Sequence, residues 1–289
     1  MISTLLLLAL PLPAAPASAT FRAAAVTPVL LQDADMKERF KEFGKILKDD
    51  DGEPDAIGMI DEFTKAYRAA DLRHKNLLDS LEFEPENEKE IKLEIKGLAK
   101  DKAAIAKVVA SCIHHKNRKT ITEANLGMWR AAAFALGQMG SDGAEHLWQV
   151  FEDKKKKFRK EPDYLALCLE QIGYTHAYAE YTEKLVDLLD HHEYLFIAKA
   201  AEALVQFQEA PGELRHEATE TMVKLLAEYY EATITDKEDI EAQEKYRKVG
   251  RSMMNALEAL TGVSQSQPLD WVKWWNDHKK KNDDTWVDA

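Results

Sequence analysis

The chain has 289 residues, and 51 acidic against 39 basic side chains give it a formal net charge of −12. That acidic excess repels phosphate backbones, which argues against generic nucleic-acid binding. Glycine is scarce at 12 residues and proline at 9, while the good helix formers Ala, Leu, Glu and Lys abound. A chain of this length can bury a substantial core without disulfides or metals, and its composition favours an all-helical protein over a β-sandwich or a doubly wound fold.

The first 19 residues have the features of a signal peptide. Residues 5–10 form an apolar core, small residues and prolines follow it, and Ala17-Ser18-Ala19 has the small-x-small pattern of a cleavage site. The apolar run is too short to span a bilayer. Residues 1–4 carry no Lys or Arg, unlike a usual signal, so the alternative is a disordered Ala/Pro-rich leader. We expect an exported protein, periplasmic or secreted, cleaved near Ala19, with a disordered lead-in over residues 20–33.

Helical periodicity starts after this lead-in. Met36, Phe40, Phe43 and Leu47 recur at spacings of four, three and four residues, which places them on one face of a helix. The stretch 49–54 contains a glycine, a proline and an acidic run, so we expect the helix to end there and a new one to begin.

The next segment predicts four more helical stretches and a connector. The apolar spacing indicates a second helix over 57–67 and a short third one over 72–81. Residues 90–96 alternate between apolar and charged side chains, as a strand would, but their Glu and Lys residues favour a helix. We expect a helix there, another over 101–113, and then a polar, basic connector over 114–120.

From Trp129 the chain repeats a pair of helices. A helix of small residues that ends at Gly140 is followed by one that Ser141 and Asp142 can cap. The first helix of the next pair ends at Gly173, which lies 33 residues after Gly140. A recurring spacing of this length is typical of helical repeat proteins.

Two further pairs follow. The third has its first helix over 196–207 and a turn at 211–212, and the fourth has helices over 253–262 and 268–280. An acidic insert, residues 231–244, lengthens the spacing between them and is expected to be solvated. Alanines let the first helices of the pairs approach closely, and a single pair cannot bury its apolar face, so stacking supplies the core.

The first pair carries a sequence that resembles a known family. This sequence is Arg130-Ala131-Ala132-Ala133-Phe134-Ala135-Leu136-Gly137, with Gly140 and Ala144 after it. It resembles the R-x-A-A-x-A-L-G-x-x-G pattern of HEAT-repeat proteins, in their PBS-lyase-like bacterial subtype. In later units Glu170 and Val205 replace the first glycine. The resemblance covers residues 120–281 and implies an all-α fold, an α-solenoid of stacked antiparallel helix pairs. Residues 34–117 would be degenerate repeats or a cap, and residues 282–289 a tail.

Four of the six tryptophans lie close to the C-terminus. Trp271, Trp274 and Trp275 are spaced i, i+3 and i+4, so they share one side of a helix, and Trp286 follows in the tail. This ending resembles the tails of other exported bacterial HEAT-repeat proteins. We interpret the helix as a terminal cap, because the end of a repeat stack needs one. The functional alternative is an aromatic platform for a glycan or a peptide.

A second candidate site is a basic cluster in this acidic chain. Its members are Lys154, Lys155, Lys156, Lys157, Arg159 and Lys160. It could bind an anionic partner or a membrane surface, or it could be a solvated helix end whose lysines suit the helix dipole. The acidic insert is its counterpart and lacks the spacing of a calcium loop.

Cysteines and histidines add no recognisable chemistry. Cys112 and Cys168 sit in apolar stretches, where they are either two buried, unpaired thiols or one disulfide. The pairs His114-His115 and His191-His192 invite a metal site, but adjacent residues on a helix face different ways. The sequence contains no zinc, nucleophile-elbow, P-loop or dinucleotide motif, so we expect no metal, no cofactor and no catalytic residue.

These patterns favour a noncatalytic scaffold: an exported HEAT-repeat protein, not an enzyme, that binds a protein or peptide partner in its groove and has no membrane span. Two alternatives stay open. The subtype resemblance implies a bilin-lyase-like chaperone or enzyme that assists attachment of bilins to phycobiliproteins, a cytoplasmic task that fits an export signal badly. The tryptophan helix would alternatively make the chain a glycan-binding module.

Overall fold

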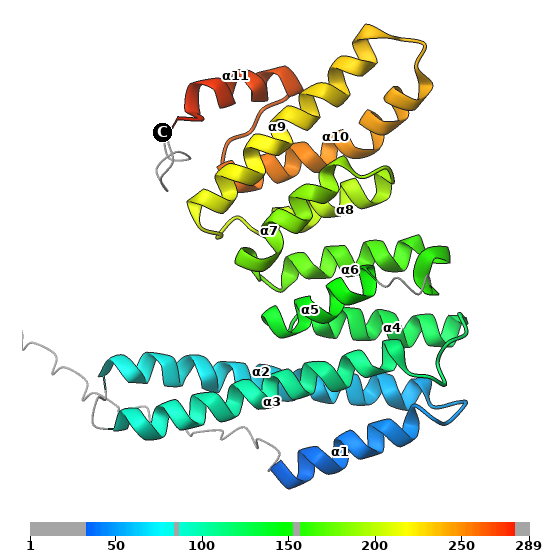
Figure 1. The fold of residues 1–289 in the computed structure, drawn as a ribbon, viewed down its shortest axis with the longest axis vertical. Coiled ribbons are helices and arrows are strands. Elements are labelled where there is room, and N and C mark those ends of the chain that lie inside the picture. The colour runs from blue at the N-terminus through cyan, green and yellow to red at the C-terminus, as the bar shows by residue number, and fades with distance from the viewer. Residues whose placement is uncertain (1–32, 84–86, 153–156, 281–289) are drawn as a thin grey trace, which may run out of the picture.

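The computed structural model describes residues 33–83, 87–152 and 157–280, and these residues contain helices and no strand. The prediction of an all-helical protein is confirmed. The α-helices are α1 Asp33–Ile46, α2 Glu53–Phe83, α3 Glu88–His114, α4 Glu123–Leu136, α5 Gly140–Phe151, α6 Pro162–Tyr174, α7 Tyr178–Asp187, α8 Tyr194–Val205, α9 Gly212–Thr235, α10 Ile240–Thr261 and α11 Pro268–His278. Two short 3-10 helices, η2 Lys157–Lys160 and η3 Leu188–Asp190, join them. Figure 1 shows the helices layered in a column from α1 at the bottom to α11 at the top.

Several predictions fall on residues outside the described ranges. They are the signal peptide over 1–19, the lead-in as far as residue 32 and the tail over 282–289. Asp33, which we assigned to the lead-in, is the first residue of α1. Within the described ranges, none of the helices combines the length and apolar character that crossing a membrane requires.

The N-terminal region differs from its prediction in the length of its helices. The stretches 57–67 and 72–81 belong to one helix of 31 residues, α2, and the stretches 90–96 and 101–113 belong to one helix of 27 residues, α3. The prediction of two separate helices was wrong in each case. Residues 68–71 contain no helix breaker, and α3 packs along α2.

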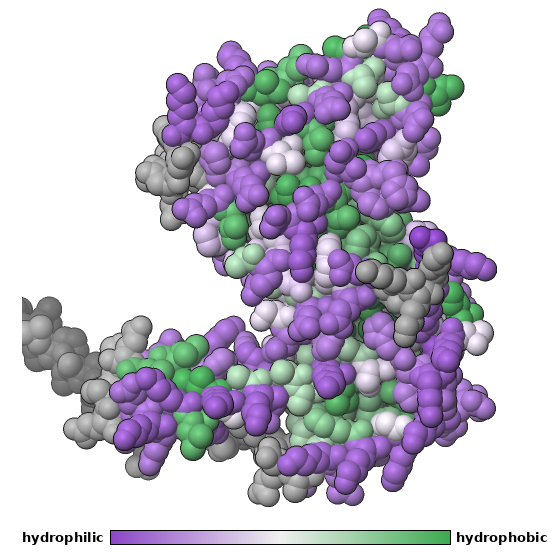
Figure 2. Space-filling view, viewed as in Figure 1, coloured by the Kyte–Doolittle hydropathy of each residue, from purple (hydrophilic) through white to green (hydrophobic). Residues whose placement is uncertain are grey.

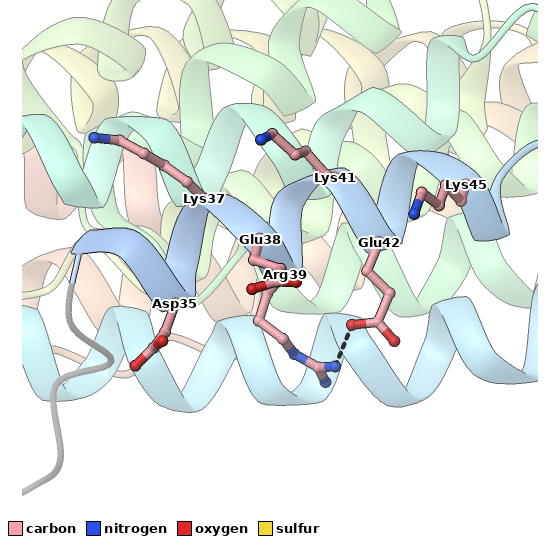
Figure 3. A pocket seen from close by; sticks show the side chains of 7 residues that line it. All are labelled: Asp35, Lys37, Glu38, Arg39, Lys41, Glu42 and Lys45. Atoms are coloured by element: carbon pink, nitrogen blue, oxygen red, sulfur yellow. Dashed lines mark hydrogen bonds and ion pairs between the residues drawn. The ribbon is translucent and has the colours of Figure 1, made fainter.

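Helix α1 covers the lower end of the core. Phe40 and Phe43 on its inner side pack edge-on against Phe63 of α2, with ring centroids 5.4 Å apart in both pairs. Its outer side carries the charged residues that line a shallow depression of about 1070 Å³, among them the Arg39–Glu42 ion pair (Figure 3). All seven lining residues come from this one helix. A charged outer face is what the end of a helical stack needs to stay solvated.

The helices expected for the four pairs are present in the predicted order, as α4 to α11. Helix α6 packs against α4, α8 against α6, and α10 against α8, whereas α11 packs against α9. The buried alanines of α4 and α8 permit these close approaches. Gly173 of α6 marks one of them, because a Cβ atom built there would lie 2.7 Å from the carbonyl oxygen of Ala203.

The start of α5 differs from its prediction. Ser141 and Asp142 lie inside the helix, which begins at Gly140 with φ +55°, and its N-cap Met139 makes no side-chain cap hydrogen bond. The Tyr67 hydroxyl of α2 lies 2.5 Å from the carbonyl oxygen of Met139 and 3.1 Å from the Asp142 carboxylate. Burial, followed by the charge of Asp142, raises the pKa of Tyr67 above its ordinary range. Tyr67 therefore stays protonated and donates a hydrogen bond that fixes this turn to α2.

The acidic insert over 231–244 is mostly helical. It comprises the last turn of α9, the short connection 236–239 and the first turn of α10, so it extends a helical hairpin. Asp239 caps α10 by accepting a hydrogen bond from the backbone N–H of Ala242 at 3.0 Å. Most side chains of the insert are exposed, as expected. Helix α10 itself ends at its C-cap Gly262, which has φ +70°.

Candidate interaction surfaces

The three tryptophans of α11 differ in exposure. Trp271 and Trp275 are buried, while Trp274 is half-buried and stacks on His278 with ring centroids 4.6 Å apart. Trp275 packs against His216 of α9 at 4.7 Å. The Trp271 indole nitrogen is buried and has no hydrogen-bond partner among the described residues. These contacts favour the interpretation of α11 as a cap on α9, and they leave little aromatic surface for a glycan.

The basic cluster does not lie on one described surface. Lys154, Lys155 and Lys156 fall outside the described residues. Arg159 and Lys160 are exposed on η2. Lys157 turns inward instead, and its Nζ lies 2.6 Å from the carbonyl oxygen of Ile113, 3.0 Å from that of Arg118 and 3.9 Å from the Trp129 ring centre.

Lys157 takes this position because the end of α3 and an aromatic cluster offer it partners. The carbonyl groups at a helix C-terminus attract a cation, and so does the face of an indole ring. Trp129 is fully buried, packs edge-on against Phe158 at 5.3 Å and donates its indole N–H to the carbonyl oxygen of Cys112 at 3.2 Å. Lys157 is therefore part of the packing between α3, α4 and η2.

The two cysteines are buried, unpaired thiols, as the first of our two alternatives had it. Burial raises the pKa of Cys168 to about 12. It does the same for Cys112, although the nearby Lys157 ammonium opposes the rise. Both thiols are protonated at neutral pH, which makes them poor nucleophiles and poor metal ligands. The described residues also contain no group of three or more His, Cys, Asp or Glu that could hold a metal ion.

The histidine pair 191–192 lies at the junction between η3 and α8. The two rings stack with centroids 4.1 Å apart, and His191 also packs against Phe196 at 5.3 Å. His191 Nδ1 accepts the backbone N–H of Glu193 at 2.9 Å, at the start of α8. Partial burial, followed by the proximity of His192, lowers the pKa of His191 in spite of the Glu193 carboxylate.

The lowered pKa of His191 predicts how the free energy of unfolding depends on pH. A histidine whose pKa is lower in the folded state stabilises the protein fully above its unfolded value of about 6.5. That contribution is lost as the pH falls through the folded value, because the unfolded chain binds the proton more readily. In His191→Asn, which keeps an acceptor at the δ position, we expect the free energy of unfolding to fall less steeply between neutral and mildly acidic pH. Urea titrations at several pH values measure it, and an unchanged slope would contradict the assignment.

One edge of the column carries the turns within successive helix pairs. We call it the turn edge, and it consists of residues 137–140, 174–177 and 206–211. Figure 1 places these turns on one side, where the outer halves of α2 and α3 extend as an arm beyond the other helices. Figure 2 shows the hollow that this arm and the upper helices enclose. The arm has exposed leucines, of which Leu93 is 73% and Leu72 60% exposed.

A groove of about 340 Å³ runs along the turn edge. It is lined by Ser141 at the start of α5, by residues 176–180 at the start of α7, and by Pro211 just before α9. Residues far apart in the sequence meet here because the helices that carry them lie in successive layers of the column. The N-caps of α5, α7 and α9 make no side-chain cap hydrogen bond, so their first turns lack the usual side-chain acceptor.

His176 and Tyr178 form the middle of this groove. His176 has φ +54°, which is uncommon for a residue other than glycine, and its Nδ1 lies 2.9 Å from the Tyr178 hydroxyl. The Tyr178 ring packs edge-on against Phe207 at 4.9 Å. Partial burial, followed by the charge of Glu209, raises the pKa of Tyr178, so its hydroxyl stays protonated. The groove thus offers an imidazole, a hydroxyl and helix N-termini, a set suited to hydrogen bonds with a peptide backbone.

From the sequence we named Ser141 as a helix cap and residues 211–212 as a turn, but we assigned no residue of this groove to a binding site. The only signal was the recurrence of turns, and nothing in it distinguished His176 from other surface histidines. Comparison of the chain with protein-family models, with curated proteins and with solved structures gives no match.

Proposed function

We propose that this chain is a noncatalytic scaffold of HEAT-repeat type, an α-solenoid of stacked antiparallel helix pairs that binds a protein or peptide partner along its turn edge. The observation that carries the proposal is the groove there, to which three successive helix pairs contribute equivalent segments. Repeat proteins characteristically use such extended concave surfaces for binding. The exposed leucines of the arm add apolar surface beside the hollow.

The chemistry of the turn edge supports a peptide as the partner. Exposed Tyr174 and half-buried Tyr178 supply aromatic area with few rotatable bonds, which favours a protein contact. The first turns of α5, α7 and α9 hold backbone N–H groups that suit carbonyl or carboxylate oxygens. Glu180 in the same groove would select against a strongly acidic segment.

Export belongs to the same proposal, because the partner would then reside in the periplasm or outside the cell. It rests on the sequence of residues 1–19 alone. Sequencing the N-terminus of the mature protein tests this part independently of the groove. A mature chain that starts near residue 20 would support export, and one that retains Met1 would contradict it.

The binding proposal is tested with a photo-reactive residue placed at Tyr174, which is 45% exposed beside the groove. The matched control is Ile57, 38% exposed on the first turns of α2. In intact cells we expect a discrete cross-linked species from position 174 and none of that mass from position 57. The double variant Tyr178→Ala/Glu180→Lys should remove it. Equal cross-linking from both positions, or an unchanged product in the double variant, would contradict binding at the turn edge.

A further inference from the structure

The far end of the α9–α10 hairpin exposes large apolar side chains. Ile240, the first residue of α10, is 79% exposed, and Ile234 in the last turn of α9 is 50% exposed. Figure 2 shows hydrophobic atoms at this tip, at the upper right, with hydrophilic atoms around them. A residue with this much apolar area gains free energy when a partner covers it.

These isoleucines belong to one apolar strip. Tyr230 precedes Ile234 by one helical turn, and its ring packs against that of Tyr246 on α10 with centroids 5.5 Å apart. Tyr246 in turn lines a groove of about 510 Å³ together with Ile240, Gln243, Glu244 and Arg247. The strip therefore continues from α9 across to the outer face of α10.

The position of this face in the column suggests the shape of what would cover it. Each earlier first helix of a pair packs against the next one, as α6 does against α4, α8 against α6 and α10 against α8. Among the described helices α10 has no such successor, because α11 packs against α9. Ile240, Gln243 and Arg247 are exposed at i, i+3 and i+7, which is the spacing at which one helix contacts another.

The charges around the strip are mixed, with an acidic excess. Residues 231–248 contain six acidic side chains and four basic ones, which are Lys237, Lys245, Arg247 and Lys248. Glu244 is neutralised by Lys248 at 2.8 Å, and Asp239 caps α10. Glu231 and Glu238 are exposed at the margins of the strip. An apolar strip with an acidic margin is complementary to an apolar face flanked by lysine or arginine.

We propose that the tip of the α9–α10 hairpin binds a basic amphipathic helix of a partner protein. The helix would lie along the first two turns of α10, where a further helix of the stack would otherwise pack. Its apolar face would cover Ile234, Ile240 and Tyr246, and its basic flank would face Glu231 and Glu238. This surface is separate from the groove at the turn edge, so either one can bind without the other.

The test uses the full chain and two fluorescently labelled synthetic helices. Both have leucines at i, i+3, i+4 and i+7, with lysine at the flanking positions in one and glutamate in the other. Fluorescence anisotropy measures their binding at low and at moderate salt. We expect the lysine peptide to bind, more weakly as salt is added, and the glutamate peptide to bind at least tenfold more weakly.

Three variants locate the binding. Ile240→Ser should lower the affinity for the lysine peptide about tenfold or more, as loss of an exposed anchor does. Glu238→Lys should lower the affinity for the lysine peptide several-fold and make that affinity depend less on the salt concentration. The control is Leu269→Ser on α11, a site 46% exposed in the native chain, which should change affinity by less than about twofold. Circular dichroism verifies that each variant is folded.

Two results would overturn the proposal. One is binding of the glutamate peptide as tightly as the lysine peptide, which would mean that the acidic margin has no role. The other is an affinity that Ile240→Ser leaves unchanged, which would place the peptide elsewhere on the chain. Cross-linking from position 174 should be unaffected by Ile240→Ser, which keeps this test separate from that of the turn edge.

Discussion

Arg118→Ala should destabilise the protein by about 3–5 kcal/mol, the usual cost of breaking a buried ion pair from one side. Arg118 lies in the connector after α3 and is only 4% exposed. Its guanidinium pairs with Glu53 at the start of α2 at 2.5 Å. It also donates hydrogen bonds to the carbonyl oxygens of Leu47 and Asp50, both at 3.2 Å, and to that of Asp49.

The expected loss is large because several partners depend on one side chain. Without Arg118 the buried Glu53 carboxylate loses its cation, and the carbonyl groups after α1 lose their donors. Urea unfolding followed by circular dichroism measures the change in free energy. Arg159→Ala, at an exposed arginine on η2, should change stability by less than about 0.5 kcal/mol.

A second variant separates the ion pair from the packing. Adding Glu53→Gln to Arg118→Ala removes the uncompensated charge, so the double variant should recover part of the lost stability. If Arg118→Ala costs no more than Arg159→Ala, the guanidinium does not hold α1 and α2 together in solution.

Gly173→Ala should destabilise the protein by about 1–3 kcal/mol, as overpacking of a tight interface does. A Cβ atom at Gly173 would lie 2.7 Å from the oxygen and 2.8 Å from the Cα of Ala203. Both are backbone atoms, so α6 and α8 must move apart for the methyl group to fit. The strain would be felt at the junction between two helix pairs.

A second glycine provides the control, because replacing it with alanine should change the stability in the opposite direction. Gly97 lies within α3, and a Cβ atom there would meet nothing within 4 Å. Gly97→Ala should therefore stabilise the protein by about 0.5–1 kcal/mol through helix propensity alone. Thermal or urea unfolding of both variants measures the difference. Two variants of equal stability would show that α6 and α8 do not approach as closely as the structure has them.

The sequence was informative wherever a local pattern decided the outcome. The recurrence of apolar residues every three or four positions and the small residues around Trp129 located the helices, because amphipathic periodicity and glycine breaks act within a few residues. The same reasoning failed for α2 and α3, which continue through the shift in apolar spacing without a break. It also failed at Ser141 and Asp142, because the turn before α5 is held by the Tyr67 hydroxyl, more than 70 residues away, which donates to the Met139 carbonyl and lies beside the Asp142 carboxylate.

The candidate sites depended on tertiary structure more than the positions of the helices did. The run from Lys154 to Lys160 reads as one basic surface in sequence, yet Lys157 turns inward onto Trp129 and the end of α3. The tryptophans of α11 share a helix side, but only their packing against α9 decided that Trp271 and Trp275 are buried. No pattern marked Arg118, since its partners come from residues 47–53, distant in the chain. His176 pairs with the nearby Tyr178, but the groove that both line is completed by distant turns.

By itself, then, the sequence determined the all-helical class, the succession of helices between residues 120 and 280, and the solvated acidic insert, because each follows from composition and from periodicity along a single helix. Only the tertiary structure decided the merging of four predicted helices into α2 and α3, the inward position of the partly buried Lys157, the burial of two tryptophans, and the groove at the turn edge. Those features arise where elements distant in sequence meet, and the free energy of such contacts depends on which partner each side chain faces.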